Sequence, residues 1–219
     1  MTQLVTHPAD LMLVAVMLMN LVVLGTSRVT SCIRAAAVQG VLLAILPIAV
    51  PRLPGLHAVV LAFAVVALKG LLIPGLLLKA MRDVQIRREV QPYVGFGSSL
   101  LLGGIATALA ILFSGRLPLA PGHEGSLLLP AALATLLSGF LVLTTRRKAI
   151  TQVVGYLVLE NGVFVFGLLL VEPLPFMVEI GVLLDLLVGV FVMGIVLNHI
   201  RQEFSSLDTD LLAQLKELP

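Results

Sequence analysis

Long hydrophobic runs dominate the sequence, and short segments rich in proline, glycine and charge separate them. The runs do not alternate apolar with polar residues, so they predict helices. A helix that spans a bilayer needs about 20 apolar residues, and its backbone is satisfied internally. We therefore predict an all-α, polytopic integral membrane protein with seven transmembrane helices. These helices cover roughly residues 9–26, 33–50, 55–80, 93–114, 127–145, 149–171 and 175–200. In the second, we expect Pro47 and Pro51 to shorten the helix or kink its outer end.

Composition supports the membrane class. The 219 residues are 59% hydrophobic and only 12% charged, and the mean hydropathy is +1.11. Soluble domains carry about 25% charged residues, so a soluble globule could not cover its surface with so few. The N-terminus lacks a basic region typical of a signal peptide, so we expect the first helix to be retained.

The distribution of lysine and arginine predicts the orientation. Of the 14 basic residues, 11 fall at the ends reached after the first, third, fifth and seventh helices, two fall on the opposite side, and Lys69 lies inside a helix. Positive charge concentrates on the cytoplasmic side of membrane proteins. We predict an N-terminus outside and a C-terminus in the cytoplasm, with Arg146, Arg147 and Lys148 as a topology anchor.

We divide the chain into four parts. Residues 1–92 form an N-terminal three-helix part, 93–126 a bridging helix and loop, 127–203 a second three-helix part, and 204–219 an amphipathic cytoplasmic tail on lipid or on a partner.

The two three-helix parts resemble one another weakly. "TSRVTSCIRAAAVQG" is similar to a shortened "TTRRKAITQVVGYLVLENG", and in this alignment Gln39 replaces Glu160 and Asn161 while Lys69 replaces Asp185. A degenerate parallel repeat joined by the bridging helix is one interpretation. Chance similarity between apolar segments is the other.

Three ionisable residues fall near the middle of predicted helices. Glu160 is about 11 residues, or roughly 16 Å, into its helix, Asp185 about ten and Lys69 about 14 residues into theirs. Each costs at least about 2.5–3.5 kcal/mol to insert, so such residues face a bundle interior or a wet cavity and commonly serve as proton or ion relays. The alternative is that they only hydrogen-bond neighbouring helices.

Other polar residues could support these three. Asn161 is costly to bury unpaired, so we expect it to hydrogen-bond a neighbouring helix. Glu179 lies within an apolar run, and His199 ends the last helix and could pass protons at neutral pH. Pro74 cannot donate to the carbonyl of Gly70, which indicates either an ordinary kink or a local polar site beside Lys69.

Redox and nucleotide chemistry lack their usual motifs. The single cysteine, Cys32, cannot form an intrachain disulfide or a cysteine-based metal site. There are no paired histidines at helical spacing and no phosphate-binding glycine loop. We expect no cofactor, no metal and no nucleic-acid partner.

The segment "RRKAITQVVGYLVLENGVFVFGLLL" resembles the K subunit of respiratory complex I and the C subunit of Mrp-type antiporters. The matching positions are Arg146, Arg147, Gly155, Glu160, Asn161, Asp185 and Gly189. Glu160 stands about one helical turn later than the first acidic residue of that family, and Asp185 replaces a glutamate as the second. One turn later keeps roughly the same helix face, so a role would be carried over by face and not by exact position. This resemblance covers the second three-helix part.

A closer resemblance covers essentially the whole chain, through "GYLVLENG", "VEIGVLLD", "LKGLLIPGLLL" and "LDTDLLAQLKE". It is to the component E family of hydrogenase-4, a membrane subunit of complex I-like formate hydrogenlyases. The resemblance implies a non-redox subunit of an oxidoreductase complex in the plasma membrane of a bacterium or archaeon. Its partners would be antiporter-like subunits, the subunit connecting to the hydrogenase arm, and lipid.

Three functional hypotheses follow. The first is proton translocation through Glu160, Asp185 and Lys69. The second is a purely structural subunit, and the third is an independent ion carrier, which the lack of a separate substrate site disfavours.

Overall fold

The structure, a computed structural model, describes residues 8–49, 65–83, 92–117 and 126–169, together with the single positions 63 and 194. Its helices are α1 (Pro8–Gly25), α2 (Val29–Ala49), η1 (Val66–Leu72), α4 (Ile73–Asp83), α5 (Phe96–Ser114), α6 (Leu128–Thr145) and α7 (Ala149–Leu168). The prediction of an all-helical fold is confirmed for these residues. Among them α1, α2, α5, α6 and α7 are long and apolar enough to cross a membrane.

The predicted seventh helix, 175–200, lies outside the described residues except for position 194. The count of seven therefore stays a prediction, as do the repeat, the division into four parts and the orientation in the membrane.

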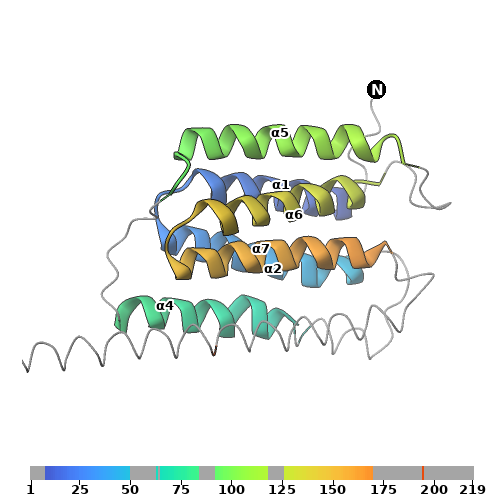
Figure 1. The fold of residues 1–219 in the computed structure, drawn as a ribbon. Helices are drawn as coiled ribbons and strands as arrows, with labels where there is room; N and C mark the ends of the chain where they lie inside the picture. Colours follow the sequence, from blue (N-terminus) through green and yellow to red (C-terminus); the bar gives the residue numbers. More distant parts are fainter. Residues whose placement is uncertain are drawn as a thin grey trace, which may run out of the picture.

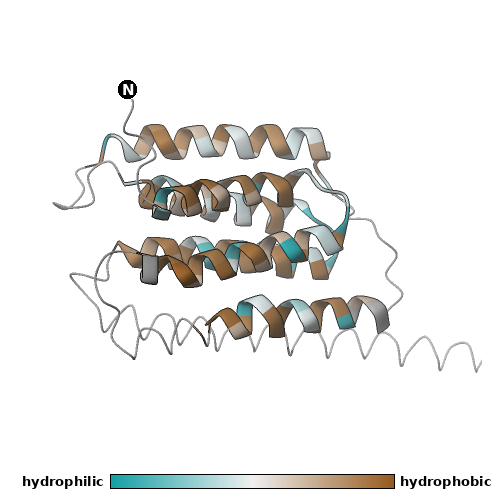
Figure 2. Cartoon of the chain, turned by 180° about the vertical axis from the view of Figure 1, so that it is seen from behind, coloured by the Kyte–Doolittle hydropathy of each residue, from teal (hydrophilic) through white to brown (hydrophobic). Residues whose placement is uncertain are grey.

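The described helices form a stack of layers (Figure 1). α5 lies on one outer side, α1 and α6 form the next layer, α2 and α7 the third, and η1 with α4 the far side. The helices α1, α5 and α7 are apolar around most of their circumference, with isolated hydrophilic positions within them (Figure 2). Helices of this kind are typical of membrane bundles, where no polar face is needed for water.

Two hydrophobic clusters fill the interior at different levels. One includes Leu24, Ile33 and Val154, and the other includes Leu13 and Val165. In α1, α2, α6 and α7, the positions between the two clusters hold buried polar side chains, namely Asn20, Gln39, Thr135, Ser138, Glu160 and Asn161. The core is thus divided by a polar layer.

Glycine allows α6 and α7 to approach closely. A Cβ at Gly155 would lie 2.6 Å from the backbone N of Leu143, and one at Gly162 would lie 2.6 Å from that of Leu136. Small residues at such contacts let helix backbones meet, which is the usual basis of helix association in membranes. This contact holds α7, and the polar residues on it, in a fixed register against α6.

The second predicted helix differs from expectation. α2 begins at Val29 and runs through Pro47 to Ala49, so Pro47 does not shorten it. Pro47 lies in the last turn, where its missing N–H removes only one hydrogen bond near the helix end. Whether Pro51 has an effect lies outside the described residues.

The third predicted helix also differs, because its described part is not uniformly α-helical. Val66–Leu72 form a π-helix, which passes into α4 and ends at Asp83. The N–H of Ile73 donates to the carbonyl of Leu68, five residues earlier. Pro74 has no N–H to continue the ordinary i−4 ladder, which accounts for the irregularity at this point.

Most of the described basic residues of the connectors gather at one end of the bundle, whereas Arg116, after α5, lies at the other. The C-terminal ends of α1, α4 and α6 meet the N-terminal ends of α2, α5 and α7 there (Figure 1). Arg28, Arg147 and Lys148 lie in these connections, and we call this end of the molecule the basic end.

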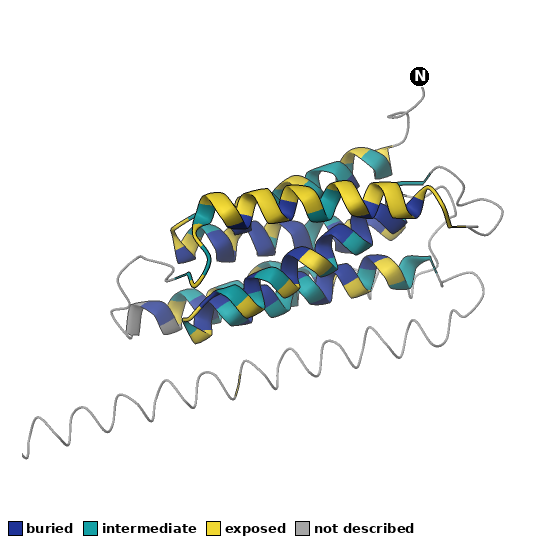
Figure 3. Ribbon diagram, turned by 45° about the horizontal axis from the view of Figure 1, so that its top comes forward, coloured by how far each residue is buried: buried dark blue, intermediate teal, exposed yellow. Residues whose placement is uncertain are grey.

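α5 is the most exposed of the described spanning helices, and exposed positions predominate on its outer side (Figure 3). Its exposed side chains include Leu101, Leu109 and Leu112. An apolar surface of this kind suits contact with lipid chains.

Candidate functional site

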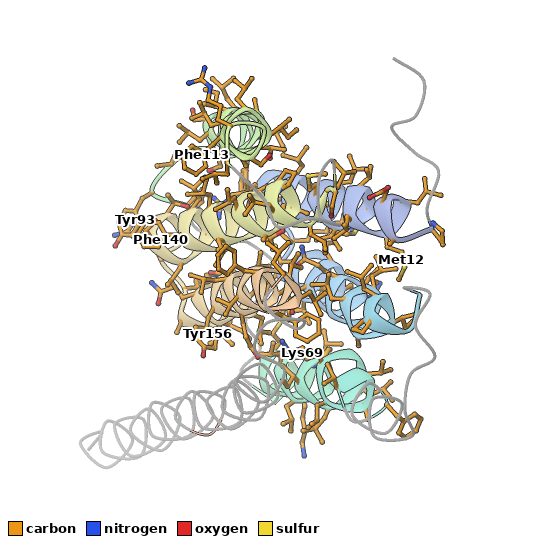
Figure 4. The ribbon with its side chains drawn as sticks, turned by 90° about the vertical axis from the view of Figure 1, so that its right-hand side faces the viewer. Met12, Lys69, Tyr93, Phe113, Phe140 and Tyr156 are labelled. Carbon is orange, nitrogen blue, oxygen red and sulfur yellow. The ribbon has the colours of Figure 1, made fainter. Side chains whose placement is uncertain are left out.

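An ion pair lies in the polar layer that divides the core. The Nζ of Lys69 on η1 lies 3.0 Å from Oε1 of Glu160 on α7, and the side chains are 11% and 2% exposed. Figure 4 shows Lys69 between η1–α4 and α7. The ring of Phe164 adds a weak contact, with its centroid 6.0 Å from Nζ. The sequence placed both charges near mid-helix, and the structure brings them together.

Two glycines allow η1 to reach this position against α2. A Cβ at Gly40 would lie 3.1 Å from Cβ of Lys69, and a Cβ at Gly70 would lie 2.7 Å from Cγ2 of Val41. The π-helical turn widens the backbone around Lys69 itself. π-Helical turns are rare and are often found at functional sites.

Asn161, next to Glu160, provides Lys69 with a second acceptor. Its Oδ1 accepts a hydrogen bond of 3.3 Å from Nζ of Lys69, and its Nδ2 donates to Oε1 of Gln39 on α2 at 3.2 Å. Asn161 therefore makes the interhelical hydrogen bonds that its burial predicted. Gln39, selected by the repeat alignment as its counterpart, contacts it directly.

Two further members of the same layer, Asn20 and Thr135, were not predicted from the sequence. Gln39 donates through Nε2 to Oδ1 of Asn20 on α1 at 2.8 Å, and Asn20 donates through Nδ2 to Oγ1 of Thr135 on α6 at 2.9 Å. Asn20 and Thr135 are completely buried. Each is a polar residue within a long apolar run, and this pattern is the sequence feature from which its burial could have been predicted.

One carboxylate oxygen of Glu160 accepts no hydrogen bond from the described residues. Oε1 contacts Lys69, but Oε2 is buried and has no hydrogen-bond partner among the described residues. A buried carboxylate oxygen without a donor is costly, and binding a proton would relieve that cost. This atom is the point in the layer where a proton could be taken up.

A small cavity reaches Lys69 and Asn161 from the direction of the basic end. Its volume is about 10 Å³, and its other walls are apolar side chains of α2, η1–α4 and α7, including Ala36, Ala37 and Pro74. A cavity of this size has room for about one water molecule.

The described ranges contain no group of three or more histidine, cysteine or acidic side chains that could hold a metal ion. Three predicted site residues, Asp185, Glu179 and His199, lie outside the described residues. Their placement relative to Lys69 and Glu160 stays a prediction.

Arg146, predicted as part of a topology anchor, is buried in the structure. It is 1% exposed and donates from Nη2 to the carbonyl of Leu24 at 2.7 Å and from Nη1 to that of Val94 at 3.4 Å. Its guanidinium also stacks 5.1 Å from the ring centroid of Phe96. Burial lowers the pKa of Arg146, although arginine still stays charged at neutral pH. Arg146 thus closes the C-terminal end of α1, where helix carbonyls attract cations. Arg147 remains exposed.

Comparison with known proteins adds to this geometry. The uncharacterized protein Rv0085 of Mycobacterium tuberculosis is 36% identical over 193 residues, which cover 84% of this chain and 85% of that protein. This chain belongs to the same family as Rv0085. Hydrogenase-4 component E of Escherichia coli is 29% identical over 150 residues, 68% of each chain, and the component of Shigella flexneri matches to the same extent. No family model and no solved structure matches.

The predicted resemblance to hydrogenase-4 component E is therefore supported as a distant homology. The resemblance of residues 127–203 to the complex I K subunit and the Mrp C subunit is not tested by these relatives, and it stays a prediction.

Proposed function

We propose that this chain is a non-redox membrane subunit of a complex I-like assembly of the hydrogenase-4 or formate hydrogenlyase type. In it, the Lys69–Glu160 pair takes up and releases protons during translocation. The distant homology to a hydrogenase-4 component supports membership of such a complex. The chain is not an enzyme on its own, and the redox chemistry belongs to other subunits.

The observation that carries the proposal is the open oxygen of a buried, paired glutamate. Oε1 of Glu160 pairs with Lys69, whereas Oε2 is buried and accepts no hydrogen bond from any described residue. Proton uptake on Oε2 neutralises the carboxylate and weakens its attraction to Lys69. Proton release restores the ion pair, so the site alternates between two charge states.

The cavity beside Lys69 supports access from the basic end, which the distribution of charge predicts to be cytoplasmic. A single water there would bring a proton carrier to the edge of the polar layer. Asp185 would be the next proton-accepting group, with Glu179 and His199 as supporting residues. That assignment rests on the family resemblance.

The partners in this proposal are antiporter-like membrane subunits and the subunit that connects them to the hydrogenase arm. The location is the plasma membrane of a bacterium or archaeon, with the exposed apolar face of α5 against lipid.

A structural role is the second candidate, and the hydrogen-bonded polar layer favours it. Interhelical hydrogen bonds in membranes contribute about 0.6 kcal/mol on average and also fix the register of helices. Under this hypothesis Glu160 and Lys69 only hold η1 to α7. An independent ion carrier is a third and weaker candidate.

The test replaces Glu160→Gln in the assembled complex. Proton uptake into inverted membrane vesicles is measured beside hydrogenase turnover with an artificial electron acceptor. We expect translocation to be lost while turnover is largely retained, because glutamine keeps the shape but cannot exchange a proton. Asp10→Asn in the first turn of α1 is the matched control. Normal translocation in Glu160→Gln would leave the structural role as the better account.

A further inference from the structure

The polar layer is a chain of side chains that crosses the bundle from α6 to η1. Its members are Thr135, Asn20, Gln39, Asn161 and Lys69, joined by four hydrogen bonds of 2.8–3.3 Å. The chain passes through both inner layers and ends at the ion pair. It therefore links α1 and α6 to the lysine through hydrogen bonds.

The direction of this chain is fixed from both ends. Besides Asn20, Nε2 of Gln39 donates to the backbone carbonyl of Val16 at 3.2 Å. A carbonyl only accepts hydrogen bonds, so the NH₂ group of Gln39 must face α1 and its oxygen must face Asn161. At the other end the ammonium of Lys69 only donates, so Asn161 must present its oxygen there.

All three amides consequently point the same way, with their NH₂ groups toward α6 and their oxygens toward Lys69. If Asn161 turned over, its NH₂ would face an ammonium and its oxygen would face the oxygen of Gln39. Both contacts would be lost, and the groups would be left unsatisfied in a buried layer. The orientation of Asn161 is therefore fixed by Lys69 at one end and, at the other, by Gln39, which the acceptors on α1 hold in place.

We propose that Thr135, Asn20 and Gln39 are positioning residues that lock the carbonyl oxygen of Asn161 onto Lys69. This inference rests on the proposed function, because it assigns the layer a role in the proton cycle of Glu160.

The role follows from a difference between two acceptors of Lys69. One of them, Glu160, changes charge when it binds a proton, and the other, Asn161, does not. When Glu160 is neutral, the locked amide oxygen still accepts from the ammonium and keeps it in the layer. Lys69 is then in place to attract the carboxylate when the proton leaves.

A packing role for the same residues makes the opposite prediction at Thr135. Thr135→Val keeps the shape but removes the hydroxyl that accepts the hydrogen bond from Nδ2 of Asn20. Thr135→Ser keeps the hydroxyl but leaves a methyl-sized gap. Positioning requires valine to be harmful and serine to be tolerated, whereas packing requires the reverse order.

The sequence offers a clean spectroscopic test, because it contains only three asparagines, Asn20, Asn161 and Asn198. The full chain, labelled with ¹⁵N only in asparagine and held in lipid nanodiscs, gives three side-chain NH₂ pairs. Asn161→Leu assigns the pair of interest. We expect Thr135→Val to shift the Asn161 signal and Thr135→Ser to leave it near its original position.

Thr107→Val is the matched control, since Thr107 on α5 donates only to the carbonyl of Gly103 in its own helix. It should leave the Asn161 signal unchanged. An Asn161 signal that is the same in Thr135→Val as in this control overturns the inference. If Thr135→Val does not fold, Thr135→Ala removes the same hydroxyl at lower steric demand.

A second experiment measures proton translocation by the same variants in the assembled complex. We expect Thr135→Val to lose about fivefold or more, with Thr135→Ser and Thr107→Val near the wild-type rate. A shifted Asn161 signal with unchanged translocation contradicts the positioning role. If Glu160→Gln translocates normally, the proposed function fails instead, whatever the spectra show.

Discussion

The Nζ of Lys69 on η1 lies 3.0 Å from Oε1 of Glu160 on α7. The pair lies in a polar layer between two hydrophobic clusters of the bundle. The carboxylate of Glu160 is buried, and the ammonium of Lys69 compensates its charge. Breaking such a pair by removing one partner is far more costly than removing both. That asymmetry makes the pair testable by stability as well as by function.

Lys69→Met is expected to destabilise the protein by about 3–5 kcal/mol, because Glu160 is left buried and uncompensated. The double variant with Glu160→Gln should recover most of this loss. The measurement is the thermal unfolding of the full chain purified in detergent. Lys79→Met, at an exposed position of α4, is the control and should change little. A double variant no more stable than Lys69→Met would show that the two charges are not energetically coupled.

Gly155→Val should separate α6 from α7. The new Cβ would meet the backbone N of Leu143 at 2.6 Å, and a helix backbone cannot give way as a side chain can. We expect a loss of about 1–3 kcal/mol or more in the unfolding free energy. Gly104→Val places the same side chain where nothing lies within 4 Å of the Cβ. Equal losses in the two variants would mean that the close approach is not what matters.

Arg146→Met should loosen the basic end, because the carbonyls of Leu24 and Val94 lose their donor. We expect about 1–3 kcal/mol of destabilisation and faster hydrogen exchange in the last turn of α1. Arg147→Met is the neighbouring control, since that side chain is exposed and only stacks on Tyr93. Similar exchange in the two variants would show that the hydrogen bonds of Arg146 do not hold the end of α1.

Orientation in the membrane can be tested with single cysteines. Cys32 is buried and is the only native cysteine, so it should react slowly with a membrane-impermeant maleimide. We expect Ser126→Cys to be labelled in intact cells and Arg147→Cys only after the cytoplasmic side is opened. The reverse pattern would invert the predicted topology.

The sequence predicted the helical class and the residues at the centre of the site, because burying a charge in an apolar run has few inexpensive solutions. Glu160 and Lys69 were found in this way, and Asn161 by the cost of an unpaired amide. Gln39 was found through a repeat alignment that no structural observation yet tests. Asp185, Glu179 and His199 stay predictions.

The missed features share a physical cause. Asn20 and Thr135 carry no charge and cost little individually, so only their contacts across the bundle show that they belong to one chain. The π-helix at Lys69 depends on how Pro74 is accommodated, which local sequence does not settle. Arg146 stands in a basic connector, and its burial depends on where the end of α1 lies.

The central claim is that Glu160 binds and releases a proton during turnover. The most direct measurement is an infrared difference spectrum of the complex in lipid as turnover begins, in the region of the protonated carboxylic acid carbonyl stretch. We predict a band that appears in the native complex and is absent in Glu160→Gln, with Asp10→Asn unchanged. A carboxylic acid signal that is the same in the native complex and in Glu160→Gln would contradict the account.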